Sequence, residues 1–435
     1  MSAATIFALA SAPGRAGIAV IRVSGVGAGE ALRRLGCPLP APRKATRARF
    51  VDPVSGDLLD DGLVLWFPAP HSFTGEDVAE LHIHGGRAVM EGVLDALSGI
   101  AGLRPAEAGE FTRRAFLNDK LDLTQAEALA DLVDAETRAQ AKQALRQMGG
   151  ALKELYDDWR HRLVQALAHL EAVIDFPDED LPPDVADKIW GDVRELETAI
   201  TRHLDDGARG ERVREGLRIA IVGAPNAGKS SLLNALARRD AAIVSEIPGT
   251  TRDVIDVHMD LGGYAVTLTD TAGLRESGDV IEQEGMRRAR AQAKDADLRI
   301  ALFDGTRARD AATAALIDAD TIEVINKSDL LKAAPPHALL ISAKTGAGVD
   351  ALIAQLVERV RAKSDSGAVV PLTRARHRAA LEECRAALAR AGNAPAPELA
   401  AEDLRLAGRA LGRLTGRVDV EELLDVVFRD FCIGK

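Results

Sequence analysis

Gly223-Ala224-Pro225-Asn226-Ala227-Gly228-Lys229-Ser230 is the stretch that decides the fold of this chain. It fits the pattern Gly-x4-Gly-Lys-Ser and follows an apolar run, 217–222, that is typical of a β-strand. Glycines here let backbone N–H groups surround phosphate oxygens, and a helix that begins at this point adds its positive N-terminal dipole. We therefore expect Lys229 to reach the β- and γ-phosphates of a nucleotide and Ser230 to ligate Mg²⁺.

A second string, Asp270-Thr271-Ala272-Gly273, follows another apolar run, 264–268. In a phosphate-binding fold, a carboxylate at the end of the neighbouring strand lies beside the metal ion, so we expect Asp270 to hold Mg²⁺ through water. We expect the backbone N–H of Gly273 to face the γ-phosphate. The two strings together predict a nucleoside triphosphate site.

A third string, Asn326-Lys327-Ser328-Asp329, follows the apolar run 322–325 and selects the base. Asp329 can accept two hydrogen bonds, from N1–H and from the 2-amino group of guanine, and adenine lacks that pair of donors. A fourth string, Ser342-Ala343-Lys344, falls where a loop behind the base is expected. Because every string follows a strand-like run, the pattern favours a doubly wound guanine-nucleotide fold over glycine turns on an ordinary α/β sheet.

The composition limits the class of protein. A chain of 435 residues is too long for one hydrophobic core, so two to three domains are expected. The net charge of −11 argues against one broad basic face for nucleic acid, although it allows a local basic patch. Three scattered cysteines suit a reducing cytosol rather than a disulfide framework or a zinc site. We see no signal peptide and no membrane-spanning stretch, and expect a cytoplasmic protein.

The pattern of apolar residues changes along the sequence. Residues 1–118 contain apolar or alternating runs separated by Pro and Gly, which predicts an α/β domain. Helical periodicity dominates 119–215 and returns in 364–435, on either side of the nucleotide domain at 216–363. Neither helical part is large enough to bury its own apolar stripe. We therefore favour one helical body with an inserted nucleotide domain over two independent domains on a linker.

Motifs outside the nucleotide region resemble the MnmE (TrmE) family of tRNA modification GTPases over nearly the whole chain. The matching segments are 13–22, 67–68, 72–77, 84–86, 110–112, 115–123, 175–179 and the carboxyl-terminal Phe431-Cys432-Ile433-Gly434-Lys435. The resemblance implies a multidomain α/β plus α fold. Its parts are an N-terminal α/β domain for folate binding and dimerisation, a discontinuous helical domain, and an inserted Ras-like P-loop GTPase domain.

The resemblance also implies a function. Family members act as cytoplasmic homodimers with an MnmG-type FAD protein, in a heterotetramer or larger complex. Together they form (carboxymethyl)aminomethyluridine at C5 of the wobble uridine, U34, of tRNA. The one-carbon unit comes from a tetrahydrofolate derivative, the 5,10-methylene or 5-formyl form. GTP hydrolysis, with potassium-dependent dimerisation of the GTPase domains, drives the cycle.

Site residues follow from the resemblance position by position. The folate contacts match Arg22, Glu80, Lys120 and Lys435. Glu80 could accept the paired N–H donors of a pterin edge, and Arg or Lys suits an anionic glutamate tail. On sequence alone, solvated surface charge is the favoured interpretation of Glu80 and Lys120, and only the flanking motifs favour the folate role. The GTP contacts match Asn226, Ala227, Gly228, Lys229, Ser230, Ser231, Ser245, Thr250, Thr251, Asp270, Thr271, Ala272, Gly273, Asn326, Lys327, Asp329, Ser342, Ala343 and Lys344.

The hydrolytic machinery departs from that of Ras, because Leu274 follows Gly273 where a glutamine would orient the attacking water. The family assigns that task to a glutamate that matches Glu282, although Glu282 could instead only stabilise a helix N-terminus. The catalytic set is then Glu282, Lys229, Thr251 and Gly273. Mg²⁺ is matched to Ser230, Thr251 and, through water, Asp270. Potassium, which replaces an arginine finger, is matched to Asn226, Ser245, Ile247 and Thr250.

Cys432 and the pair of His82 and His84 can each be interpreted in more than one way. Cys432 could be a nucleophile or an inert small hydrophobe. His82 and His84 lie two residues apart on one strand face, where folate-cavity lining or a core role is favoured over metal binding. The nucleotide motifs alone would also permit a ribosome-assembly or RNA-chaperone GTPase. A third alternative is a folate-binding one-carbon transferase whose GTPase is only regulatory.

Overall fold

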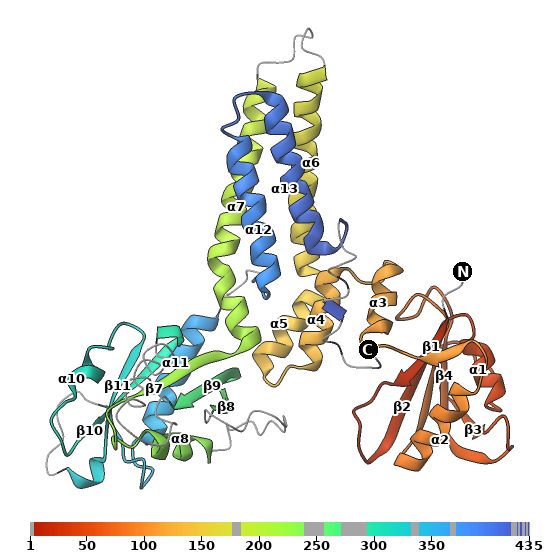
Figure 1. Cartoon of the computed structure of the whole chain (residues 1–435), viewed down its shortest axis with the longest axis horizontal. Helices are drawn as coiled ribbons and strands as arrows, with labels where there is room; N and C mark the ends of the chain where they lie inside the picture. The colour runs from red at the N-terminus through yellow and green to blue at the C-terminus, as the bar shows by residue number, and fades with distance from the viewer. Residues whose placement is uncertain are drawn as a thin grey trace, which may run out of the picture. The chain divides into compact units, whose positions relative to one another are not determined.

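The computed structural model describes residues 4–175, 184–238, 256–270, 294–331, 339–365 and 371–418, together with Leu424, Val427, Phe428, Phe431 and Gly434. Contacts between residues divide the chain into two compact units. Figure 1 shows the helices and strands of both units, coloured by residue number. Unit 1 comprises Met1–Ala130, Met148–Gln165 and Arg405–Lys435. Unit 2 comprises Asp131–Gln147 and Ala166–Leu404. Each unit is therefore assembled from segments that are distant in the sequence.

Unit 1 contains a six-stranded sheet, in the order β3-β4-β5-β2-β1-β6 among the described residues. Its pairs are antiparallel except β1 with β6. Alternating apolar residues of the strands pack with α1 and α2 on one face, which gives the core of this sheet. The elements are β1 (Thr5–Leu9), β2 (Ala16–Ser24), α1 (Ala28–Arg34), β3 (Thr46–Val51), β4 (Leu58–Phe67), β5 (Val78–Gly85), α2 (Arg87–Ser98), β6 (Leu103–Pro105) and α3 (Glu110–Leu117).

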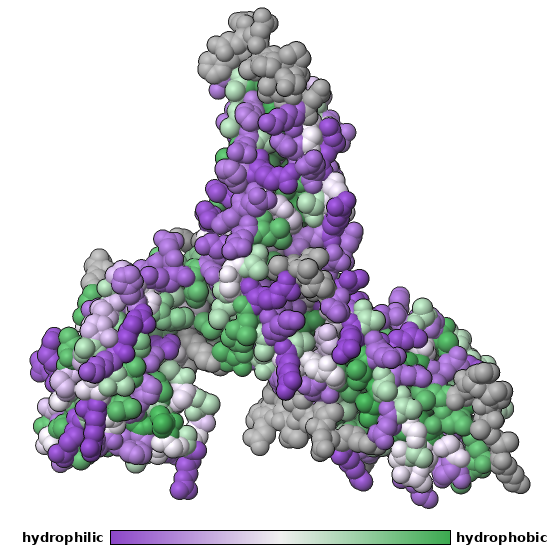
Figure 2. Space-filling view, turned by 180° about the vertical axis from the view of Figure 1, so that it is seen from behind, coloured by the Kyte–Doolittle hydropathy of each residue, from purple (hydrophilic) through white to green (hydrophobic). Residues whose placement is uncertain are grey.

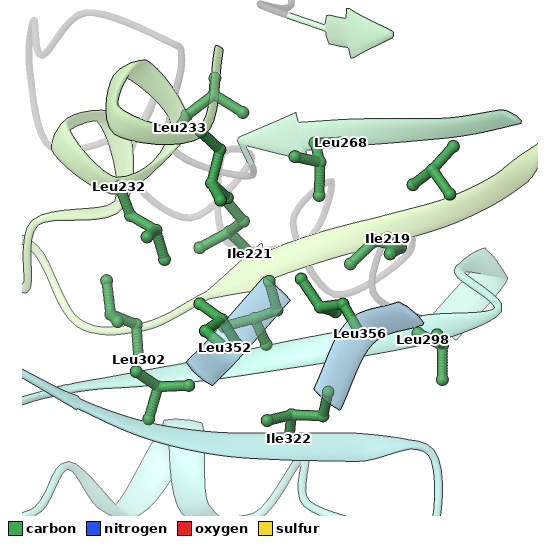
Figure 3. Close-up of a cluster of buried hydrophobic side chains, with 14 of the residues drawn as sticks. Ile219, Ile221, Leu232, Leu233, Leu268, Leu298, Leu302, Ile322, Leu352 and Leu356 are labelled. Carbon is green, nitrogen blue, oxygen red and sulfur yellow. The ribbon is translucent and has the colours of Figure 1, made fainter. Parts of the chain in front are cut away.

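Unit 2 contains a second sheet, in the order β12-β11-β10-β7-β9-β8. It is parallel except for β8, which pairs antiparallel with β9 at the edge. Leu232 and Leu233 of α8 and Leu352 and Leu356 of α11 pack on the strand residues of one face (Figure 3). The elements are β7 (Leu217–Val222), α8 (Lys229–Ala237), β8 (Asp256–Leu261), β9 (Tyr264–Asp270), β10 (Leu298–Asp304), α10 (Ala311–Ala314), β11 (Thr321–Asn326), η1 (Ser328–Leu330), β12 (Leu339–Leu340) and α11 (Val349–Ser364).

The remaining elements are helices: α4 (Leu123–Val133), α5 (Arg138–Met148), α6 (Ala151–Asp175), α7 (Asp184–Glu215), α12 (Ala375–Ala391) and α13 (Pro397–Thr415). The face shown in Figure 2 presents mainly hydrophilic side chains along the long helices, as amphipathic helices should. No helix among the described residues is long and apolar enough to cross a membrane.

The structure confirms the predicted fold class of α/β sheets combined with helices. The predicted strand-like runs 217–222, 264–268 and 322–325 lie in β7, β9 and β11. In this doubly wound order β7 lies between β9 and β10, and β11 lies next to β10. Because these strands are parallel, the carboxyl ends of the three that precede motifs, β7, β9 and β11, meet at one edge of the sheet. The predicted domain boundaries at 118, 215 and 363 stay predictions.

Candidate functional site

The glycine-containing loop joins β7 to α8 at this edge. Its backbone turns through two left-handed positions, Asn226 at φ 65° and Gly228 at φ 98°. A Cβ on Gly228 would lie 2.2 Å from Nδ2 of Asn326, so no side chain fits there. Gly228 therefore meets both a conformational and a steric requirement, and α8 begins directly after it, at Lys229.

Lys229 folds back over this loop. Its ammonium group donates to the carbonyl oxygens of Gly223, at 2.9 Å, and Ala224, at 3.1 Å. Burial lowers the pKa of Lys229, and the nearby carboxylate of Asp270 opposes that shift. The positive charge thus sits inside the loop, where phosphate oxygens could take the place of the two carbonyl groups.

Ser230 and Asp270 bring a hydroxyl and a carboxylate together beside the loop. Ser230 Oγ donates to Asp270 Oδ2 at 2.6 Å, and Asp270 is buried at the end of β9. Such hard oxygen donors suit Mg²⁺, which uses few protein ligands alongside water and phosphate oxygens. The residues present therefore fit the predicted metal ion.

Asn326 connects the glycine loop to the loop that follows β12. Its Nδ2 donates to the carbonyl of Ala227 at 2.8 Å, and its Oδ1 accepts from the N–H of Ala343 at 3.0 Å. The sequence assigned Asn326 to the GTP contacts; its described contacts hold two binding loops together. Ser342 is fully buried in the second loop, and its Oγ accepts from the N–H of Thr345.

Lys327 and Asp304 form a second tie at the same edge. Lys327 adopts a left-handed backbone conformation, φ 63°, and its Nζ donates to Asp304 Oδ2 at 2.6 Å. Burial would raise the pKa of Asp304, but hydrogen bonds from Lys327 and Thr306 outweigh it and hold that pKa at about 2. Asp329 and Lys344 are exposed. An unpaired carboxylate is costly only when it is buried, so Asp329 would select guanine only if the bound base covers it.

A separate polar cluster occupies the sheet of unit 1, on the face opposite α1 and α2. Arg22 of β2 and Glu80 of β5 are cross-strand partners, and Arg22 Nη2 donates to Glu80 Oε1 at 2.9 Å. The Arg22 guanidinium also lies over the rings of Phe73 and Phe111. His82 follows on the same face; its Nε2 is buried without a hydrogen bond and lies 3.7 Å from Glu80 Oε2.

His84 and Lys120 make other contacts. His84 pairs with Asp60 at 2.8 Å instead of with His82. Lys120 is exposed beside Gly75, where a Cβ would lie 3.1 Å from Lys120 Cε. In the part of the chain that the structure describes, no three His, Cys, Asp or Glu residues form a metal-binding group.

Sequence reasoning missed a chain of ion pairs that supports this cluster. Arg114 of α3 bonds to Glu76 at 3.0 Å and to Glu110 at 2.9 Å. Glu110 also accepts from Arg104, and Glu76 accepts from the hydroxyl of Ser24. The pairs fasten the loop with Phe73 and the helix with Phe111, which both contact Arg22. Only the spacing of Glu110 and Arg114, one helical turn apart, could have indicated them.

Several predicted site residues lie outside the described residues. They are Ser245, Ile247, Thr250, Thr251, Thr271, Ala272, Gly273, Glu282, Cys432 and Lys435.

Comparisons with known proteins cover the whole chain. A family model described as the GTP-binding protein TrmE N-terminus matches residues 5–120, and one described as the MnmE helical domain matches 123–432. Proteins named tRNA modification GTPase MnmE from Rhodospirillum rubrum and Paramagnetospirillum magneticum are 58% and 60% identical. The alignments cover 100% of this chain and of the first relative, and 99% of this chain and of the second. A solved G domain of the T. maritima FeoB transporter is 23% identical over 34% of this chain and 99% of its own, with a TM-score of 0.26.

The connecting role of Asn326 can be tested by Asn326→Ala. The change leaves a buried carbonyl and an N–H without partners, so we expect the free energy of unfolding to fall by about 3 kcal/mol and the Kd for GDP to rise roughly tenfold or more. Chemical denaturation and a fluorescent GDP analogue measure the two effects. Asn234→Ala, at an exposed position of α8, is the matched control. Unchanged GDP affinity in Asn326→Ala would contradict the role.

Proposed function

The chain belongs to the MnmE family of tRNA modification GTPases, and we propose that it hydrolyses GTP to GDP and phosphate as the driving component of tRNA wobble-uridine modification. The observation that carries the proposal is the convergence of Lys229, Ser230, Asp270 and Asn326 at one edge of a doubly wound sheet. Relatives of matching length that are named tRNA modification GTPases support the link to tRNA.

The chain's own groups would bind the triphosphate in defined ways. The amides of the glycine loop and the dipole of α8 favour the phosphates, and the buried Lys229 adds a point charge. Ser230, Thr251 and, through water, Asp270 would hold Mg²⁺, which neutralises phosphate charge when bound. Asp329 would accept the two donors of guanine, backed by the loop at 342–344. This arrangement binds GTP in preference to ATP.

Hydrolysis needs a group that orients water, and Leu274 cannot supply it. Glu282 is the proposed substitute, with the N–H of Gly273 and the hydroxyl of Thr251 closing on the γ-phosphate side. Asn226, Ser245, Ile247 and Thr250 would hold potassium, whose charge stands in for an arginine. The exposure of Asn226 and its left-handed backbone support the assignment, because its amide oxygen is not taken up by packing.

The cluster on the sheet of unit 1 fits the edge of a reduced folate. Glu80 offers a carboxylate to paired N–H donors, and the unpaired buried Nε2 of His82 lies beside it. A pterin presents N–H donors next to a carbonyl acceptor, so the two side chains match that edge. Arg22, Lys120 and Lys435 would supply positive charge for the anionic tail. The match of residues 5–120 to the TrmE N-terminus supports this assignment.

The proposed assembly is a cytosolic homodimer that works with an MnmG-type FAD protein on tRNA. The full-length match to relatives named for tRNA modification favours this function over ribosome assembly or RNA chaperoning. A one-carbon transferase with a merely regulatory GTPase differs in one respect: its transfer chemistry would continue without GTP hydrolysis.

Glu282→Ala separates these two alternatives. We expect GTP to bind normally and hydrolysis to slow by roughly 10²–10⁴-fold, as for loss of a general base. Mass spectrometry of tRNA nucleosides should then show depleted C5-modified wobble uridine. Glu284→Ala removes the same kind of side chain two positions along the sequence, and this control should hydrolyse GTP and support modification as wild type does. Full modification in a strain whose purified Glu282→Ala protein has lost hydrolysis would refute the coupling.

Glu80→Gln tests the folate site. The amide presents a donor where the pterin needs an acceptor, so we expect the Kd for 5-formyltetrahydrofolate to rise roughly tenfold or more in calorimetry, with GTP binding unchanged. His84→Ala, an exposed histidine of the same strand face, is the control and should bind folate as wild type does. Equal affinities for Glu80→Gln and wild type would remove Glu80 from the site.

A further inference from the structure

A short segment of the chain groups with the nucleotide-binding sheet although its sequence neighbours do not. Asp131–Gln147 belongs to unit 2, whereas the residues up to Ala130 and those from Met148 to Gln165 belong to unit 1. The segment contains nearly all of α5. The segment makes several polar contacts within unit 2.

Three glutamines of α5 hold two other parts of unit 2. Gln140, Gln143 and Gln147 are spaced by three and four residues, so they share one helix face. Gln140 Nε2 donates to the carbonyl of Arg214 at 3.1 Å, and Gln143 Nε2 donates to that of Gly210 at 3.0 Å. The carbonyl of Arg214 is one of the last four of α7, which have no donor within the helix, and that of Gly210 lies one turn earlier.

The third glutamine reaches the chain ahead of α12. Gln147 Nε2 donates to the carbonyl of Pro371 at 3.3 Å, and its Oε1 accepts from the hydroxyl of Thr373 at 3.3 Å. α7 leads into β7 and the glycine loop, while 371–373 follows the nucleotide domain in the sequence. α5 therefore binds both connections between the nucleotide domain and the long helices.

Two more features lock these connections together. Asp131 Oδ1 accepts from Arg214 Nε at 2.9 Å and from Arg374 Nη2 at 2.7 Å, so one carboxylate joins both. The connections also cross in close contact, since a Cβ on Gly210 would lie 2.0 Å from the carbonyl oxygen of Leu372. We call Asp131, at the end of α4, and Gln140, Gln143 and Gln147 of α5 the α5 clamp.

The first turn of α5 touches the nucleotide domain itself. The N–H of Ala139 donates to the carbonyl of Gly263 at 3.0 Å, in the turn between β8 and β9. β8 begins at Asp256, shortly after the predicted site residues Thr250 and Thr251 in the sequence, and β9 ends at Asp270. The β8–β9 hairpin therefore connects in the sequence to both predicted γ-phosphate segments, one before β8 and one after β9. The turn of this hairpin contacts α5.

We propose that α5 transmits the nucleotide state of the sheet to α7 and α12, and that Gln143 and Gln147 are positioning residues for this coupling. The inference rests on the proposed function, because it needs a nucleotide that changes the hairpin. A shift of the β8–β9 tip would move α5, and the clamp would carry that shift to the bases of two long helices at once. Directional hydrogen bonds suit this task, because they hold discrete arrangements.

The test compares Gln143→Leu and Gln147→Leu with Gln165→Leu, which changes an exposed glutamine of α6. Hydrogen exchange of the full-length protein is measured over 371–378 and 203–215, with GDP and with a non-hydrolysable GTP analogue. We expect a nucleotide-dependent difference in wild type and Gln165→Leu, and its loss in both clamp variants. GTP hydrolysis should stay within about twofold of wild type, while wobble modification falls roughly tenfold, in the range of typical coupling energies.

A purely structural role predicts a different result. Thermal stability would fall, but the exchange difference and the ratio of modification to hydrolysis would match wild type, and that outcome overturns the proposal. Gln143→Lys keeps a donor and should restore the exchange difference, which also covers the case that a leucine variant folds poorly. If wild type itself neither hydrolyses GTP nor supports modification, the proposed function fails instead of the clamp.

Discussion

The paired hydrogen bonds of Asn326 are the interaction on which the nucleotide site depends. One amide joins the glycine loop, through Ala227, to the loop at Ala343, and Gly228 must lack a side chain to let it through. A buried amide with both ends satisfied is stable only at this separation of the loops. The phosphate end and the base end of the site are therefore held in register by one side chain.

Much of this site was predictable because its parts are local. Each motif string follows its own apolar run, and parallel strands bring their carboxyl ends to one edge, so the convergence of Lys229, Asp270 and Asn326 follows from the order of the sheet. Asn326 illustrates the limit. Its type and position were predicted, but its bridging contacts depend on how closely two loops approach, which no spacing records.

The contacts that were not predicted depend on pairing between residues far apart in the sequence. Arg22 faces Glu80 because β2 and β5 pair in one register, and 58 positions separate them. The ion pairs of Arg114 and the glutamines of α5 were missed for a related reason. Helical periodicity shows which face of a helix is apolar, but not which carbonyls its polar face will meet. Gln143 and Gln165 look alike in the sequence, yet Gln143 bonds to a carbonyl of α7 whereas Gln165 is exposed on α6.

The nucleotide edge and the α5 clamp differ in the kind of contacts that they make. At the nucleotide edge, the buried Lys229 bonds to two backbone carbonyls of its own loop. The contacts of α5 instead run from side chains to the backbone of neighbouring elements. Such contacts can exchange partners by one residue without unfolding either helix. Amide contacts at the carboxyl end of α7 and ahead of α12 fix the angle as well as the distance between their partners, whereas an apolar interface of the same size is held by packing without that directionality.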